Sequence, residues 1–129
     1  MKLEEEARKF MQDRLIITEV MTAELYEAQA GETAIFPKEK ALEYLALGLT
    51  SEAGEVAGKV KKLIRDGEDV EGFEMKKIAI SHEIGDVLWY CAMMAKEVGV
   101  PLADIMQENL DKLHSRKERG TLSGSGDDR

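Results

Sequence analysis

Two pairs of acidic residues in this sequence have a spacing that can build a metal-binding site. Glu52 and Glu55 are three positions apart in LTSEAGEVAGKVKK, and Glu83 and Asp86 are three positions apart in SHEIGDVLWY. Small or apolar residues surround both pairs. Because residues three apart share a face of an α-helix, each pair presents two carboxylates in one direction. Carboxylates gathered where water is scarce repel one another unless protons or cations neutralise them.

The two pairs also lie at matched distances from a predicted turn, RDGEDVEG, at residues 65–72. Glu52 and Asp86 are equidistant from residue 69, and so are Glu55 and Glu83. In an antiparallel hairpin with helix axes about 8–10 Å apart, side chains at equal distances from the turn can meet. Oxygen-only ligands favour Mg²⁺, Mn²⁺ or Ca²⁺ over Zn²⁺. The sequence therefore predicts a cluster of four carboxylates that binds divalent cations and, through them, a nucleotide polyphosphate.

Two other interpretations of these acidic residues are weaker. Solvated surface carboxylates paired with nearby lysines would explain one such pair, but two pairs at matched depth favour a metal site. A di-iron carboxylate bundle uses Glu-x-x-His, whereas the third residue after Glu52 and after Glu83 is again acidic.

The elements that must position these residues are helices. Apolar residues recur at helical spacing, only two prolines interrupt the chain, and no stretch alternates as a strand would. The predicted helices run from about Glu4 to Ala30, Lys38 to Arg65, Phe73 to Val98 and Pro101 to Arg119. We therefore expect an all-α fold, a small helical bundle of four main helices. A single domain over residues 1–119 would precede a Gly/Ser-rich tail over residues 120–129.

Composition limits the possible partners. The net charge of −8 over 129 residues argues against non-specific binding to nucleic acid or to an anionic membrane. The sequence has no apolar run of about 20 residues that could span a bilayer and no apolar signal core at its N-terminus. The single cysteine, Cys91, excludes an intramolecular disulfide and fits a buried structural thiol. We expect a soluble cytoplasmic protein.

Several cationic and polar residues could bind phosphate. Lys59 follows Glu55 by four positions on the same helix face, although a Glu–Lys pair at this spacing is common on any helix. Asn109, Lys112 and Arg116 follow one another at helical spacing beside a core stripe on the last predicted helix. This face could hold phosphate oxygens, but by itself it also fits an ordinary solvated surface.

Trp89 and Met93 continue the helix face of Asp86, at three and seven residues after it. They could form the floor of a base pocket, although aromatic residues at this spacing more often belong to the core. The sequence has no P-loop and no arrangement of a nucleophile with a base. It therefore gives no support to covalent catalysis.

EAGEVAGKVKK followed by HEIGDVLWY resembles the E-x-x-E … E-x-x-D signature of the MazG-like, all-α NTP pyrophosphohydrolases. YEAQAGETAIFPK and ENLDKLHSRKERGTLSGSGDDR are similar to flanking segments of a phage and bacterial subgroup of that family. The resemblance implies a MazG-like fold and hydrolysis of (deoxy)nucleoside triphosphates to monophosphate and pyrophosphate, in nucleotide-pool housecleaning. It also implies a homodimer or homotetramer with sites near subunit interfaces.

The resemblance assigns roles to individual residues. Mg²⁺, or Mn²⁺ as a substitute, would bind Glu52, Glu55, Glu83 and Asp86, which form the catalytic set. Substrate contacts would come from Lys59, Asn109, Lys112 and Arg116 on the phosphate side, and from Gln29 and Trp89 on the nucleoside side. Ser51 stands where the family often has a further acidic residue. Two alternatives stay open: a catalytically silent interaction module with a structural divalent cation, and a phosphohydrolase acting on another polyphosphate.

Overall fold

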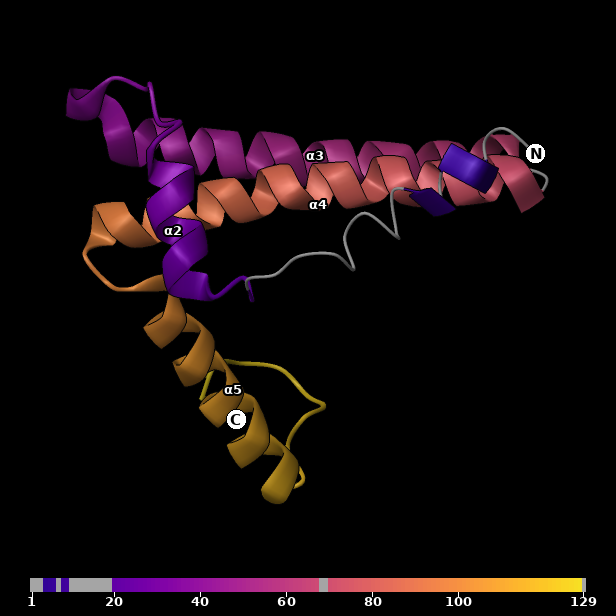
Figure 1. Cartoon of the computed structure of the whole chain (residues 1–129). Helices are drawn as coiled ribbons and strands as arrows, with labels where there is room; N and C mark the ends of the chain where they lie inside the picture. Colours follow the sequence, from indigo (N-terminus) through magenta and orange to yellow (C-terminus); the bar gives the residue numbers. More distant parts are fainter. Residues whose placement is uncertain (1–3, 7, 10–19, 68–69, 129) are drawn as a thin grey trace.

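The computed structural model describes residues 4–6, 8–9, 20–67 and 70–128. The elements are α2 (Ala23–Gly31), the one-turn 3-10 helix η1 (Lys38–Lys40), α3 (Ala41–Asp66), α4 (Val70–Val98) and α5 (Leu102–Glu118) (Figure 1). These described residues contain no strand. The prediction of an all-α fold is therefore confirmed, with four longer helices, α2 to α5, in the described part of the chain.

Helices α3 and α4 form a long antiparallel hairpin and lie side by side along their length (Figure 1). Helix α3 ends where Gly67 adopts a positive φ of 61° and its N–H donates to the carbonyl of Leu63 at 3.2 Å. Glycine is the usual residue at such a helix end because it has no Cβ to strain the left-handed conformation. Helix α4 begins at Val70, three residues earlier than predicted, so the turn is shorter than RDGEDVEG.

The prediction of one uninterrupted helix from Glu4 to Ala30 is wrong. Residues 20–22 are not helical, and α2 begins at Ala23. The hydroxyl of Thr22 accepts a hydrogen bond from the N–H of Leu25 at 3.1 Å, which caps the first turn of α2. Residues 7 and 10–19 of the predicted helix lie outside the described residues. A threonine within an apolar run thus starts a new helix here.

Helix α4 ends at Val98. Gly99, just beyond it, has a φ of 75°, and the N–H of Val100 donates to the carbonyl of Ala95 at 3.1 Å. Pro101 then caps α5, as predicted, and α5 leads away from the hairpin (Figure 1). The carboxylate of Glu27 on α2 accepts the N–H of Leu102 at 3.4 Å. This contact joins α2 to the start of α5, so three helices meet at one end of the hairpin.

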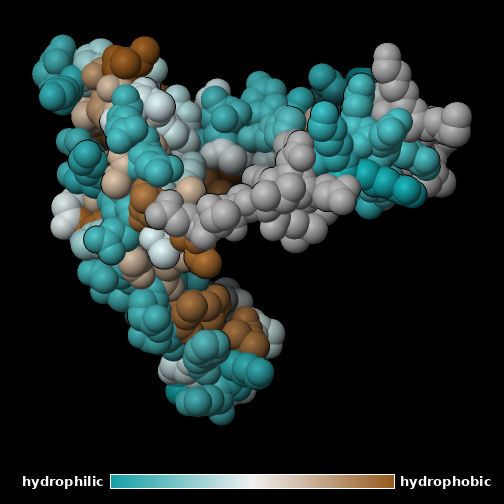
Figure 2. All heavy atoms as spheres, viewed as in Figure 1, coloured by the Kyte–Doolittle hydropathy of each residue, from teal (hydrophilic) through white to brown (hydrophobic). Residues whose placement is uncertain are grey.

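The core lies at that same end. Ala30, Leu45, Ala92 and Met93 are buried there, and partly buried side chains from α2, the 32–37 connection, α4 and α5 pack against them. Much apolar surface stays exposed elsewhere. Figure 2 shows apolar side chains gathered over α5, where Ile105, Met106, Leu110 and Leu113 are all exposed. Among the described helices, none has the length and apolarity needed to cross a membrane.

Candidate active site

Three of the four predicted carboxylates meet between α3 and α4. One oxygen each from Glu52, Glu83 and Asp86 lie within 4.8 Å of one another. Glu52 and Glu83 are partly buried, whereas Asp86 is exposed. We call these three residues the carboxylate cluster. It arises because the antiparallel hairpin brings residues equally far from its turn to the same level, as the spacing predicts.

One lysine partly compensates the charge of the cluster. The ammonium of Lys59 on α3 lies 3.1 Å from Oε1 of Glu83 on α4. Burial, and then the negative charges of Asp86, Glu83 and Glu55, raise the pKa of Glu52 above its ordinary value. Lys59 therefore offsets part of the negative charge of the three carboxylates. Their oxygen-only chemistry, close approach and excess negative charge fit a hard divalent cation such as Mg²⁺.

Glu55 lies outside the compact cluster although it belongs to the same helix face. Its side chain is exposed on α3, one turn from Glu52. It is close enough for its charge to contribute to the raised pKa of Glu52. The structure thus gives three converging carboxylates and a fourth beside them, rather than four at equal range.

Tyr26 and Tyr90 lie near the cluster, Tyr44 lies beside Tyr90, and none of the three was predicted from the sequence as part of the site. Burial and the charge of Asp86 raise the pKa of Tyr26 on α2. Burial, the neighbouring Tyr44 and the charge of Glu52 raise the pKa of Tyr90. The sequence could have predicted two of these positions from helical spacing. Tyr44 precedes Glu52 by eight residues and Tyr90 follows Asp86 by four, and such spacings bring residues to neighbouring parts of one helix face. The cluster therefore has an aromatic side toward the core end of the hairpin.

The repulsion within the cluster predicts a pH effect on the protein without metal. Because the pKa of Glu52 is raised in the folded state, the folded chain binds more protons than the unfolded chain between the two pKa values. The contribution of Glu52 to stability is therefore present at low pH and is lost as pH rises through the folded pKa. We expect Glu52→Gln to gain stability relative to wild type as pH rises from about 4 to 7. Thermal unfolding in EDTA measures this difference, and a difference independent of pH would contradict it.

Trp89 lies in an aromatic group at the core end of the hairpin. Its indole N–H donates to the hydroxyl of Thr33 at 2.8 Å, and its ring meets Tyr90 and Phe36 edge to face at 5.0 and 6.4 Å. These contacts hold the 32–37 connection against α4. Gln29 is exposed on the last turn of α2.

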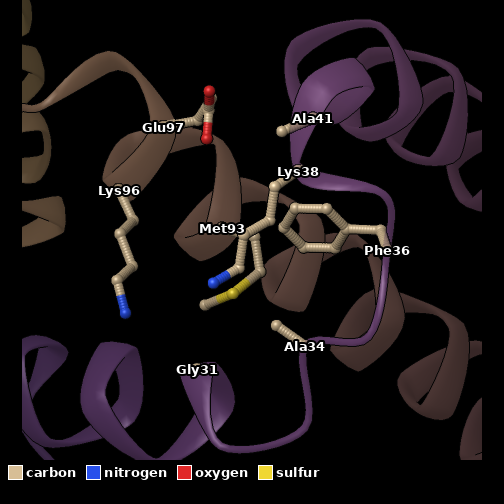
Figure 3. A pocket seen from close by; sticks show the side chains of 8 residues that line it. All are labelled: Gly31, Ala34, Phe36, Lys38, Ala41, Met93, Lys96 and Glu97. Atoms are coloured by element: carbon tan, nitrogen blue, oxygen red, sulfur yellow. The ribbon is translucent and has the colours of Figure 1, made fainter.

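A pocket of about 330 Å³ lies beyond this aromatic group, at the core end of the hairpin (Figure 3). The side chains of Phe36 and Met93 lie together inside it, and Lys96 and Glu97 stand apart from them (Figure 3). Met93 lines this pocket and also belongs to the buried core. Trp89 is not among the lining residues.

The predicted phosphate contacts on α5 are not brought to the cluster within one chain. Asn109 and Lys112 line a shallow surface pocket with Ile105 and Glu108, on the helix that leads away from the hairpin (Figure 1). The sequence predicted their common helix face, but the direction of α5 separates that face from the carboxylates of the same chain.

Arg116 lies further along α5, where the C-terminal tail covers it. It is 6% exposed, and its Nη2 donates to the carbonyl of Asp127 at 2.7 Å. The N–H of Thr121 donates to the carbonyl of Arg116 at 2.8 Å. The tail therefore folds back on α5, and the guanidinium of Arg116 is turned to the tail.

An all-α fold whose hairpin gathers carboxylates from two helices defines a helical protein with a candidate divalent-cation site. The sequence profile of the MazG nucleotide pyrophosphohydrolase domain matches residues 40–121, which contain the whole hairpin and α5. The chain belongs to the MazG nucleotide pyrophosphohydrolase family. It is 43% identical over 115 residues to the Gene 37 protein of Mycobacterium phage L5, covering 84% of this chain and 100% of that protein. No solved structure matches the chain.

Proposed function

We propose that this protein hydrolyses nucleoside or deoxynucleoside triphosphates to the monophosphate and pyrophosphate, with Mg²⁺ or, as a substitute, Mn²⁺. The observation that carries the proposal is the convergence of Glu52, Glu83 and Asp86 within 4.8 Å on the hairpin of a MazG-family chain. These residues would hold the cation, with Glu55 as a fourth ligand beside them. Bound there, the cation would supply charge stabilisation to the phosphates and lower the pKa of a bound water.

The residues of the site support a direct hydrolysis. Water adds to the α-phosphorus, the bond from that phosphorus to the bridging oxygen breaks, and the bridging oxygen leaves with the β-phosphate as pyrophosphate. Glu52 or its neighbour Glu55 would orient the water and accept its proton. Lys59, held 3.1 Å from Glu83, is placed to offset phosphate charge.

We propose that Asn109 and Lys112 contact the phosphates at the carboxylate cluster of a second copy, in a homodimer or homotetramer, and that Arg116, which the tail covers, helps to shape that face of α5. Two observations support this arrangement. Helix α5 carries these residues away from the cluster of its own chain (Figure 1). It also exposes an apolar stripe that includes Met106, at 51%, and Leu110, at 47%, and contiguous exposed apolar surface is typical of interaction sites.

On the nucleoside side, Gln29 and Trp89 are proposed to contribute from the core end of the hairpin. This end also carries Tyr26 and Tyr90, whose aromatic rings offer partners for a base. Together these assignments place a nucleotide along the α3–α4 hairpin.

A substrate panel tests the proposed function. Purified protein would be incubated with all ribo- and deoxyribonucleoside triphosphates in Mg²⁺, and the products separated by chromatography. We expect monophosphate and pyrophosphate in equal amounts from at least one nucleotide, and none in EDTA. No product from any nucleotide, with metal still bound, would instead favour the silent interaction module. Release of single phosphates would indicate a phosphohydrolase of another kind.

A further inference from the structure

A second pocket lies on the hairpin beyond the carboxylate cluster, toward the α3–α4 turn. Its volume is about 220 Å³. The lining residues are Lys59, Lys62, Asp66, Lys76 and Ala79. We call it the lysine pocket, because three of its five lining residues are lysines, and they come from both helices of the hairpin.

The lysine pocket is continuous with the carboxylate cluster. Lys59 lines the pocket and also lies 3.1 Å from Glu83 of the cluster. On α3, Lys62 continues the face of Lys59 at a spacing of three, and on α4, Lys76 precedes Glu83 by seven residues. Seven residues are two helical turns, about 10 Å along the axis. A single extended polyphosphate can therefore contact both the lysine pocket and the carboxylate cluster.

The charge of the pocket selects for an anion. Its one carboxylate, Asp66, already accepts two hydrogen bonds from Arg65, at 2.6 and 2.9 Å. Those bonds, and then the positive charges of Lys76 and Lys62, hold the pKa of Asp66 below its ordinary value. Lys62 and Lys76 are thus both close enough to the carboxylate of Asp66 to lower its pKa. Among the lining residues, three lysines therefore stand against one carboxylate, which Arg65 also contacts.

The two ends of the hairpin therefore differ in chemistry. The tyrosines and the core lie on one side of the carboxylate cluster, and the lysine pocket lies on the other. A nucleoside has an aromatic base and no charge, whereas pyrophosphate has several negative charges. This asymmetry assigns a direction to a bound nucleotide.

We infer that the lysine pocket binds the β- and γ-phosphates of the substrate and holds the pyrophosphate after the bond breaks. Lys62 and Lys76 are the residues that this inference adds to the site. The bound nucleotide lies along the α3–α4 groove with its terminal phosphates toward the turn. The inference rests on the proposed function, but pyrophosphate binding can be measured without hydrolysis.

The test is calorimetric titration of inorganic pyrophosphate, in Mg²⁺, into wild type and the variants Lys62→Gln, Lys76→Gln and the double variant. We expect weaker binding, by about threefold for each single variant and about tenfold for both, because partly solvated charge pairs are individually modest. The matched controls are Lys61→Gln and Lys77→Gln. These lysines are the chain neighbours of Lys62 and Lys76, are exposed, and do not line the pocket. We expect control variants to bind pyrophosphate as wild type does.

A second readout uses the monophosphate product of the best substrate in the panel. Its inhibition constant should be the same in wild type and in the double variant, because its one phosphate does not reach the lysine pocket. Equal losses for pyrophosphate and monophosphate, or equal losses in the Lys61 and Lys77 controls, would overturn the inference. Lysine-dependent pyrophosphate binding in a protein that hydrolyses no nucleotide would overturn the proposed function and leave the pocket assignment standing. Hydrolysis of a nucleotide by a protein whose pyrophosphate binding does not depend on Lys62 and Lys76 would support the proposed function and overturn the pocket assignment.

Discussion

Asp86→Asn is expected to reduce Mg²⁺-dependent release of pyrophosphate by more than about 100-fold, because even the loss of an outer-shell partner of a metal ligand costs about 10–100-fold. The substitution keeps the size of the side chain but removes one negative charge and a carboxylate oxygen from the cluster of Glu52, Glu83 and Asp86. A neutral amide offers a cation a weaker ligand. Repulsion within the metal-free cluster also falls, so the folded chain should not lose stability.

The measurement is twofold: the initial rate of pyrophosphate release, and Mg²⁺ affinity by calorimetry. Asp104→Asn is the matched control, since Asp104 is exposed on α5 and outside the cluster. Glu55→Gln is measured in the same two assays as Asp86→Asn. We expect Glu55→Gln also to lose activity but to keep more of the Mg²⁺ affinity, because Glu55 stands beside the compact cluster rather than in it. Near-normal turnover in folded Asp86→Asn and Glu55→Gln would remove the metal assignment.

Gly48→Ala is expected to destabilise the protein by about 1–3 kcal/mol, the usual cost of forcing an extra methyl group into a packed place. A Cβ at position 48 of α3 would overlap the ring of Tyr90 on α4. Helix α3 can lie so close to α4 at this level only because the residue is glycine. Tyr90 stands four residues from Asp86, so displacement of its ring should also disturb the aromatic side of the cluster.

Gly54→Ala provides the control for this effect. Gly54 lies on the same helix, but a Cβ there meets no atom within 4 Å. Alanine in a helix is favoured over glycine by about 0.5–1 kcal/mol, so Gly54→Ala should be neutral or stabilising. Urea unfolding of the three proteins compares them directly. Equal stability of Gly48→Ala and Gly54→Ala would show that the contact between Gly48 and Tyr90 does not limit the approach of the helices.

The all-α fold and the register of the hairpin could be predicted from the sequence alone. Helical spacing of apolar residues gave α3, α4 and α5 to within a few residues, since this periodicity follows from the geometry of the helix. A short turn leaves an antiparallel hairpin little freedom to slip. Residues equidistant from the turn are therefore expected to face one another. Glu52 and Asp86 do so, whereas Glu55, the counterpart of Glu83, lies beside the cluster.

The way in which the remaining elements meet this hairpin could not be predicted from the sequence and is seen in the fold. Tyr26 lies near Asp86 because α2 packs across the end of α4, and no spacing in the sequence contains that crossing. Helix α5 leaves the hairpin after Gly99 and Pro101, which carries Asn109 and Lys112 away from the carboxylates of their own chain. Local periodicity fixes which residues share a helix face. The direction in which that face points depends on the geometry of the junctions between helices and on long-range packing. These two factors set the direction of α5 and the position of the tyrosines relative to the carboxylate cluster.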